Sequence, residues 1–130
     1  MFFNRNKDEY RNINDKDISL ITEALEYSNL IKGQNGFAIE TEQSEYTGNL
    51  NLPTGIIVYT VYIKCLREDN SELYKKQKES IDLFEDKYRT NLAHKYNITS
   101  GCLESLLNDT EKELIYTFYY HDEDVNRNDN

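Results

Sequence analysis

The stretch Gly55-Ile-Ile-Val-Tyr-Thr-Val-Tyr-Ile-Lys-Cys-Leu66 is the longest run of strongly β-favouring residues in the chain. The single proline stands just before it, and a polar segment follows it. Successive side chains of a strand point to opposite faces, so the odd-numbered positions 57–65 form a largely apolar face. The even-numbered face is only half apolar, because it carries Thr60, Tyr62 and Lys64. We predict a strand with its odd face in the core and, if helices cover one side only, its even face in water.

The segments before this strand predict a helix and a second strand. Apolar residues recur on one broad face over residues 18–31, and Asp15 or Asp17 can cap the N-terminus of that helix. Residues 37–43 alternate apolar and polar side chains, which is typical of a strand with one face in the core. We expect this strand to pair antiparallel with residues 55–66.

The segments after it predict a long helix, a short helix and a last strand. The period becomes helical over residues 71–96, with a narrow apolar stripe that suits either a helix lying on a sheet or a coiled-coil seam. Gln77 interrupts the stripe and favours the first interpretation. Three leucines at helical spacing predict a short helix over Cys102–Asn108. Residues 114–120 are apolar or aromatic on both faces, which favours a central strand.

Together these elements predict an α+β fold. We expect a small, mixed or antiparallel sheet of about three strands with two main helices on one face, in the order α-β-β-α-(short α)-β. A chain of 130 residues is typical of one domain, which we place at residues 15–121. Residues 1–14 are predicted to be a flexible or loosely docked arm, and residues 122–130 a disordered acidic tail.

Composition and charge exclude several classes of function. The formal net charge of −9 disfavours direct binding to nucleic acid or to an anionic membrane, because both need Lys and Arg. The chain becomes charged directly after Met1-Phe2-Phe3, so we expect neither a signal sequence nor a membrane span. Two cysteines without a framework pattern fit a reducing compartment. We therefore predict a cytoplasmic protein.

The chain carries no motif of a known catalytic or cofactor site. The five glycines are too scattered for a phosphate-binding loop, and there is no H-E-x-x-H, C-x-x-C or G-x-S-x-G. We predict no cofactor and no metal site. The strongest enzymatic candidate is Cys102 at the predicted helix N-terminus, with His94 or His121 as base and Asp109 as its orienting group. A small core cysteine and two surface histidines explain the same residues more simply.

What remains is an acidic, tyrosine-bearing surface. Two acidic blocks lie on or beside predicted strands and would form one negative field if those strands share a sheet. The candidate partner-binding residues are Glu40, Glu42, Glu45, Tyr62, Asp122, Glu123 and Asp124. The simpler alternative is that these carboxylates only keep a sheet edge soluble.

From this surface we predict a non-enzymatic module that inhibits or neutralises a basic or nucleic-acid-binding partner protein. Immunity proteins and phage inhibitors of nucleases or defence systems have this kind of composition, and their carboxylates can stand in for phosphates. A second hypothesis is a homo-oligomeric structural, assembly or chaperone protein, such as a homodimer, that associates through the long helix or a sheet edge. A cysteine-dependent enzyme is the third.

Overall fold

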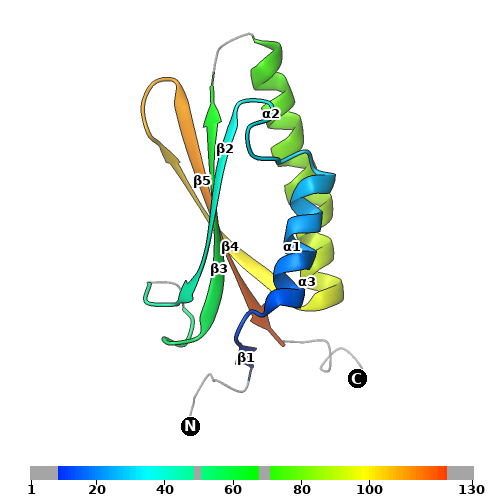
Figure 1. Cartoon of the computed structure of the whole chain (residues 1–130), viewed down its shortest axis with the longest axis vertical. Helices are drawn as coiled ribbons and strands as arrows, with labels where there is room; N and C mark the ends of the chain where they lie inside the picture. The colour runs from blue at the N-terminus through cyan, green and yellow to red at the C-terminus, as the bar shows by residue number, and fades with distance from the viewer. Residues whose placement is uncertain (1–8, 49–50, 68–70, 123–130) are drawn as a thin grey trace.

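The computed structural model describes residues 9–48, 51–67 and 71–122, and all statements below concern those residues (Figure 1). A strongly twisted, curled sheet forms one layer, and two helical rods form the other. The elements in chain order are β1 (Tyr10–Arg11), α1 (Asp15–Tyr27), β2 (Phe37–Glu45), β3 (Ile57–Leu66), α2 (Glu72–Leu83), the π-helical segment η1 (Phe84–Arg89), α3 (Thr90–Tyr96), β4 (Ile98–Leu106) and β5 (Glu111–His121).

The sheet is antiparallel throughout and runs in the order β4-β5-β3-β2. β5 is central, because Tyr116 pairs with Val61 of β3 on one side and with Cys102 of β4 on the other. The short β1 pairs with the last two residues of β5, where Arg11 lies opposite Tyr120. Residues close to the two ends of the domain are thereby joined in one sheet.

The prediction of a three-stranded sheet with a short helix before its last strand was wrong. The described residues form five strands, and residues 98–106 form β4 where the short helix was expected. The leucines that suggested a buried helix face are exposed, with Leu103 at 63%, Leu106 at 58% and Leu107 at 42%. Helical spacing of three leucines was therefore overridden by backbone pairing with β5, a non-local interaction that local periodicity does not report.

The turn that follows β4 explains the misassigned boundary. Asn108 was expected to end a helix, but its Oδ1 accepts hydrogen bonds from the backbone nitrogens of Thr110 and Glu111, at 2.8 and 2.9 Å. Asn side chains commonly close turns in this way. The same residue therefore closes the β4-β5 hairpin. β1 was also missed, because two paired residues leave no alternation to detect.

The first helix begins three residues earlier than predicted. Asn14 caps it, since its Oδ1 accepts from the backbone nitrogen of Asp17 at 3.0 Å, and Asp17 Oδ2 accepts from the backbone nitrogen of Asn14 at 3.0 Å. This reciprocal arrangement is a capping box. The buried Asp17 carboxylate also pairs with Arg11 Nη1 at 2.7 Å. Helix α1 is thereby joined to β1.

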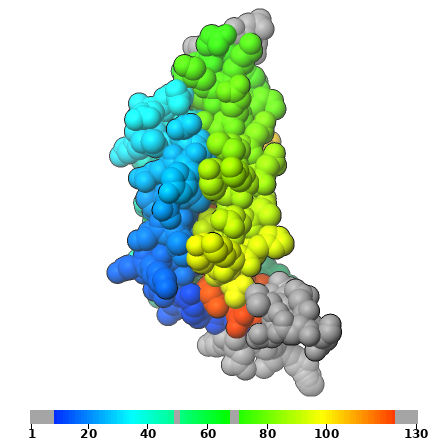
Figure 2. Space-filling model, turned by 90° about the vertical axis from the view of Figure 1, so that its right-hand side faces the viewer, coloured from blue at the N-terminus to red at the C-terminus, as the bar shows by residue number. Residues whose placement is uncertain are grey.

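The second helical rod comprises α2, η1 and α3 without a break, as the helical period over residues 71–96 predicted. It starts at the N-cap Ser71 and ends at Asn97, whose φ of 59° is the left-handed conformation that often terminates helices. Its apolar stripe is buried within the domain, because Phe84 and Leu92 pack in the main core. Figure 2 shows this rod and α1 side by side, covering the same face of the molecule.

Aromatic residues form the centre of the core. The Phe84 ring packs edge-on against Tyr116 and Phe118, with centroid distances of 5.2 and 6.3 Å. All three side chains are fully buried, and Val61 and Ile63 of β3 lie in the same cluster. The odd face of β3 is therefore in the core, as its alternation predicted.

Replacement of Phe84 by alanine should lower the free energy of unfolding by about 3 to 5 kcal/mol, because it removes a fully buried ring and leaves a cavity. Leu83→Ala is the matched control on the neighbouring residue, which is 37% exposed, and should cost less than about 1 kcal/mol. Urea denaturation of both variants measures the difference. Equal destabilisation by the two substitutions would contradict the packing described here.

Candidate functional site

Both helical rods lie on one side of the sheet, so within the described part of the chain the middle of its other side has no second layer (Figure 1). The register places side chains from four strands in one row on this side: Leu103 opposite Ile115, Ile115 opposite Tyr62, and Tyr62 opposite Glu40. Cross-strand partners share a face of the sheet. We call this surface the outer face; its members are Ala38, Glu40, Glu42, Thr60, Tyr62, Lys64, Leu103, Glu113, Ile115 and Thr117.

One end of this side of the sheet is closed by a small second core. Tyr46, Ile56 and Val58 are buried there, and Tyr10 and Tyr119 pack against them with Leu52. The Tyr10 ring also stacks on His121, at a centroid distance of 4.4 Å. The outer face is therefore bounded at this end and open over the central rows of the sheet.

The open rows combine an aromatic ring with carboxylates. The Tyr62 hydroxyl donates a hydrogen bond to Glu42 Oε1 at 3.4 Å, and Glu40 is exposed beside it. Burial, together with the negative charges of Glu42 and Glu113, raises the pKa of the Tyr62 phenol. Tyr62 is therefore a neutral hydrogen-bond donor at physiological pH, and the negative charge resides on the carboxylates.

A hollow of about 170 Å³ lies on the outer face, lined by Ala38, Glu40, Tyr62, Lys64 and Glu113. It has a simple steric origin, because the small Ala38 lies between long side chains and opposite Lys64. Two carboxylates and one ammonium group border it, so its local charge is negative.

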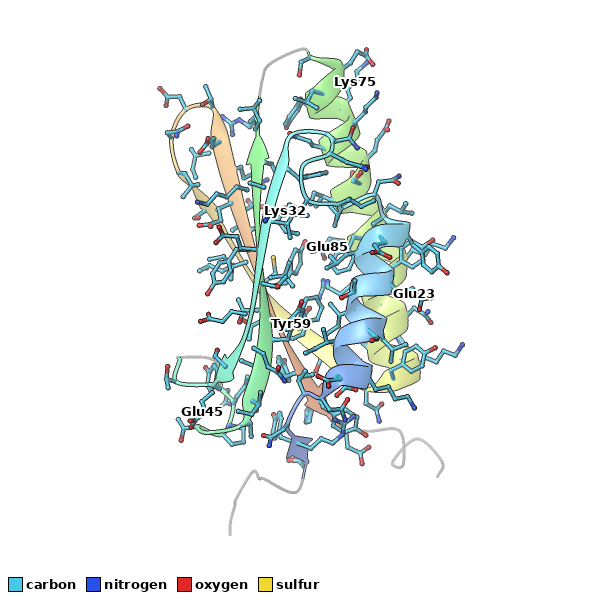
Figure 3. The ribbon with its side chains drawn as sticks, in the orientation of Figure 1. Glu23, Lys32, Glu45, Tyr59, Lys75 and Glu85 are labelled. Carbon is cyan, nitrogen blue, oxygen red and sulfur yellow. The ribbon has the colours of Figure 1, made fainter. Side chains whose placement is uncertain are left out.

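The structure brings three of the predicted partner-binding residues together. Glu40, Glu42 and Tyr62 are neighbours on the outer face, as the predicted pairing of the two strands implied. Glu45 lies at the end of β2 opposite Ile57, and its odd number places it on the other side of that strand. Figure 3 shows Glu45 at the end of the sheet, away from its centre.

The second acidic block lies elsewhere. Asp122 follows β5 seven residues after Ile115, which is roughly 24 Å along an extended strand. Its Oδ1 accepts a hydrogen bond from Asn97 Nδ2 at 3.2 Å, so it lies beside the end of the second helical rod. Glu123 and Asp124 lie outside the described residues. The described part of the two blocks therefore does not form one continuous field.

Sequence reasoning missed several members of the outer face. Ile115 and Glu113 could have been found from parity, because they alternate with the buried Leu114 and Tyr116 along β5. Leu103 could not have been placed there, since its segment was assigned to a helix. The sequence did not indicate a role for Ala38, because its small side chain matters only through the space that it leaves between the longer side chains beside it.

The geometry around Cys102 differs from that of an activated thiol. Cys102 is an exposed residue within β4 opposite Tyr116, not at a helix N-terminus, and partial desolvation of its thiol together with the Glu85 charge raises its pKa. His121 lies five residues beyond Tyr116 on β5, roughly 17 Å along the strand. Across residues 9–48, 51–67 and 71–122, no group of three or more His, Cys, Asp and Glu side chains is placed to hold a metal ion.

Comparisons with protein-family models, curated proteins and solved structures found no match to this chain. No helix within the described ranges is long and apolar enough to cross a membrane. The geometry and charge of the outer face are thus the observations from which a function can be inferred.

The two cysteines should react slowly with Ellman's reagent in the folded protein, because the thiolate is the reactive species. In a Cys65→Ala variant, Cys102 should be labelled at neutral pH more slowly in the folded protein than in the urea-unfolded protein. Its labelling rate in the folded protein should increase as the pH rises toward the raised pKa of its thiol. Burial raises the pKa of Cys65 to about 11. In a Cys102→Ser variant, where Cys65 is the remaining thiol, it should therefore react at neutral pH only after unfolding. Faster labelling of Cys102 in the folded state at pH 7 would instead support a thiol enzyme.

Proposed function

We propose that the protein is a non-enzymatic module that binds a basic partner protein through its outer face. The hollow over Ala38 carries this proposal, because Glu40 and Glu113 border it on a sheet face that no helix covers. A Lys or Arg side chain of the partner would lay its apolar stem against the Tyr62 ring and place its charge between the carboxylates.

The remaining outer face provides the other components of a protein interface. Tyr62, Ile115 and Leu103 form an apolar row that leads away from the acidic residues, and Leu103 is largely exposed. Aromatic and aliphatic anchors of this kind supply most of the binding energy in protein complexes. The net charge of −9 adds long-range attraction, which accelerates encounter with a basic partner.

The partner that best fits this surface is a protein that itself binds nucleic acid. Such a protein presents Lys and Arg side chains arranged to contact phosphates. Glu40, Glu42 and Glu113 would occupy those side chains and thereby block access of the nucleic acid. In this proposal the protein acts as an inhibitor or neutraliser, as immunity proteins and phage-encoded nuclease inhibitors do.

Charge reversal on the outer face should weaken partner binding without unfolding the protein. The test variant is Glu40→Lys/Glu42→Lys, which changes two exposed residues of an edge strand. The control is Glu26→Lys/Glu79→Lys, which makes the same change in net charge at exposed positions on the two helical rods. A protein captured from the native host by the wild type should bind the first variant at least about tenfold more weakly and the second nearly normally.

The salt dependence of that binding provides the independent measurement. With the purified partner, the affinity of the wild type should fall as ionic strength rises, because exposed charges are screened. Equal affinity of both double variants, or an affinity unaffected by salt, would contradict the proposal. Circular dichroism of the variants checks that a loss of binding is not a loss of fold.

A second candidate function, homo-oligomeric assembly, is favoured by the β4 edge. Within the described residues β4 pairs with β5 alone, and Leu103, Leu106 and Leu107 are exposed on it or directly after it. An unpaired, apolar edge strand can pair with the same strand of a second copy. The stripe of the second helical rod does not offer such a surface, because its central residues Phe84 and Leu92 are buried in the domain.

Light scattering distinguishes this candidate from a monomeric binding module. Assembly through the β4 edge predicts a mass above the 15.4 kDa of one chain, which should return to 15.4 kDa in Leu103→Lys/Leu106→Lys. Tyr27→Lys/Leu83→Lys alters two exposed apolar residues of the helices and should leave the mass unchanged. A wild-type mass of 15.4 kDa at all concentrations would exclude the second candidate.

A further inference from the structure

A cavity of about 300 Å³ lies on the opposite side of the sheet from the outer face, between the second helical rod and strands β3, β4 and β5. Figure 1 shows α2 extending past the end of α1, so one rod covers this part of the sheet. Charged side chains line the cavity from both layers, and the sheet contributes Arg67, Glu104 and Lys112. The volume is at the small end of the range for sites that bind small molecules.

The charges that the rod contributes to this lining are paired. Lys78 Nζ lies 3.4 Å from Asp82 Oδ2, one turn further along α2. Glu85 accepts a hydrogen bond from Arg89 Nη2 at 2.6 Å and another from the Tyr116 hydroxyl. Each carboxylate on this wall therefore already has a cation beside it, and the wall carries no excess charge of either sign.

Arg67 differs from these residues because its charge is not paired. Within the described residues its guanidinium makes no hydrogen bond, ion pair or ring contact. The residue is half-buried, yet its nitrogens are open to solvent, since the buried side-chain atoms without a partner in the described part of the chain are Gln77 Oε1 and Thr99 Oγ1. A guanidinium that is partly desolvated, accessible and unpaired is available to bind an anion.

The register of the sheet places Arg67 on the cavity side. Its backbone nitrogen donates a hydrogen bond to the oxygen of Thr110, so the pairing of β3 with β5 continues one residue pair beyond Leu66 and Glu111. Because side chains alternate between faces, Arg67 shares a face with the buried Cys65. Glu111 lies on the opposite face by the same alternation, so its carboxylate is not the missing partner.

Lys112 brings a second cation to the same end of the cavity. It lies opposite Cys65 and is therefore a diagonal neighbour of Arg67 across the two strands. Its Nζ lies 3.1 Å from Glu104 Oε2, but the Glu104 side chain is 62% exposed, and exposed ion pairs are weak. Two cations thus meet one carboxylate here, which leaves a net positive charge in a protein whose net charge is −9.

This basic end, defined by Arg67, Lys112 and Glu104, can be reached from outside the protein. The three residues also line a neighbouring hollow of about 360 Å³, together with Ser105 and Leu106 after the cavity-facing part of β4. They therefore lie where the cavity meets the surface. A ligand entering from solvent meets the positive charge first.

The rod wall opposite the basic end is fixed by Gln77. Its Nε2 donates a hydrogen bond to the backbone oxygen of Asn35 at 2.8 Å. Gly36 has a φ of +75°, and a Cβ atom on it would lie 2.8 Å from the same nitrogen, so the glycine permits this approach. The bond joins α2 to the turn before β2 and holds the wall in place without a ligand. Gln77 Oε1 is buried, so we assign it no contact with a ligand.

We propose that this cavity binds a small molecule with one anionic group, a carboxylate or a phosphate, which forms a two-pronged ion pair with Arg67. A guanidinium presents parallel N–H groups that match the oxygens of both anions. Lys112 lies beside this position and adds a second positive charge. Glu85 and Glu104 would repel a second anionic group, so the ligand carries its negative charge at one end. The site is separate from the outer face and does not depend on the binding of a partner protein.

Benzoate and benzamide test the proposal as a matched pair, because they have nearly the same size and only benzoate is an anion. In NMR titrations of the full chain at pH 7, benzoate should shift the Arg67 side-chain signal and bind at least about tenfold more tightly than benzamide. Phenyl phosphate, titrated in parallel, distinguishes the two anion classes. Tighter binding of benzoate assigns a carboxylate ligand, and tighter binding of phenyl phosphate assigns a phosphate ligand.

Substitution of Arg67 provides the test within the protein. Arg67→Gln removes a charge that makes no contact in the described structure, so the fold should be kept and the preference for the anion lost. Lys75→Gln is the matched control, because it removes the same charge at an exposed position of α2 outside the cavity lining. Arg67→Lys should bind benzoate with intermediate affinity, since it keeps the charge and loses the paired N–H groups.

Three results would overturn the proposal. They are the absence of any shift of the cavity signals with either anion, equal affinity for benzoate and benzamide, and equal binding of benzoate by Arg67→Gln and Lys75→Gln. The amide spectra of the variants show whether each is folded. If Arg67→Gln is unfolded, the comparison of Arg67→Lys with Lys75→Gln decides in its place, and equal affinities of these two variants contradict a paired contact with the guanidinium.

Discussion

The hydroxyl of Tyr116 donates to Glu85 across the interface between the sheet and the second helical rod, and much of the structure depends on this contact. Tyr116 is fully buried in the central strand, between Val61 and Cys102 of the neighbouring strands. Its ring packs against Phe84, the residue just before Glu85. Burial and the Glu85 carboxylate raise the pKa of Tyr116, so the phenol keeps its proton and remains a donor. One side chain thus provides both apolar packing and a polar anchor.

This anchor explains why the two sides of the sheet differ. The rod and α1 are held on one side, where they cover the aromatic core, and residues 9–48, 51–67 and 71–122 include no second helical layer for the other side. A curled sheet with one helical layer must leave part of its other face in water. The chain places Tyr62, Ile115 and carboxylates there, rather than the uniformly polar residues of a passive solvent face. That choice of residues is the physical basis of the proposed binding function.

The same arrangement leaves the cavity beside α2. At η1 and α3 the second rod has α1 as its neighbour, and the two together cover the concave side of the sheet. At α2 the second rod lies alone and cannot fill the same width. The protein borders that space with Gln77, whose nitrogen is bonded and whose oxygen is not. The outer face therefore follows from the position of both rods on one side of the sheet, and the cavity lies beside α2 on the covered side.

Much of the local structure could be predicted from short-range patterns. The period of two identified β3 and its core face, the period of 3.6 identified both rods, and the predicted pairing placed Glu40 and Glu42 beside Tyr62. These features depend on residues close together in the chain, whose spacing directly reflects which side is buried. The identity of β4 was not predictable in this way, because the leucines at 103, 106 and 107, on the strand and directly after it, have helical spacing and remain exposed.

The sequence by itself determined an acidic α+β domain, two amphipathic helices, and a central β-favouring strand with one apolar face. Only the tertiary structure decided the number of strands, the separation of Asp122 from Glu40, and the meeting of Gln77 with the turn at Gly36. The physical reason is the range of the interactions. Periodicity reports burial one turn or one strand at a time, whereas strand pairing and cavity formation join residues that lie far apart along the chain.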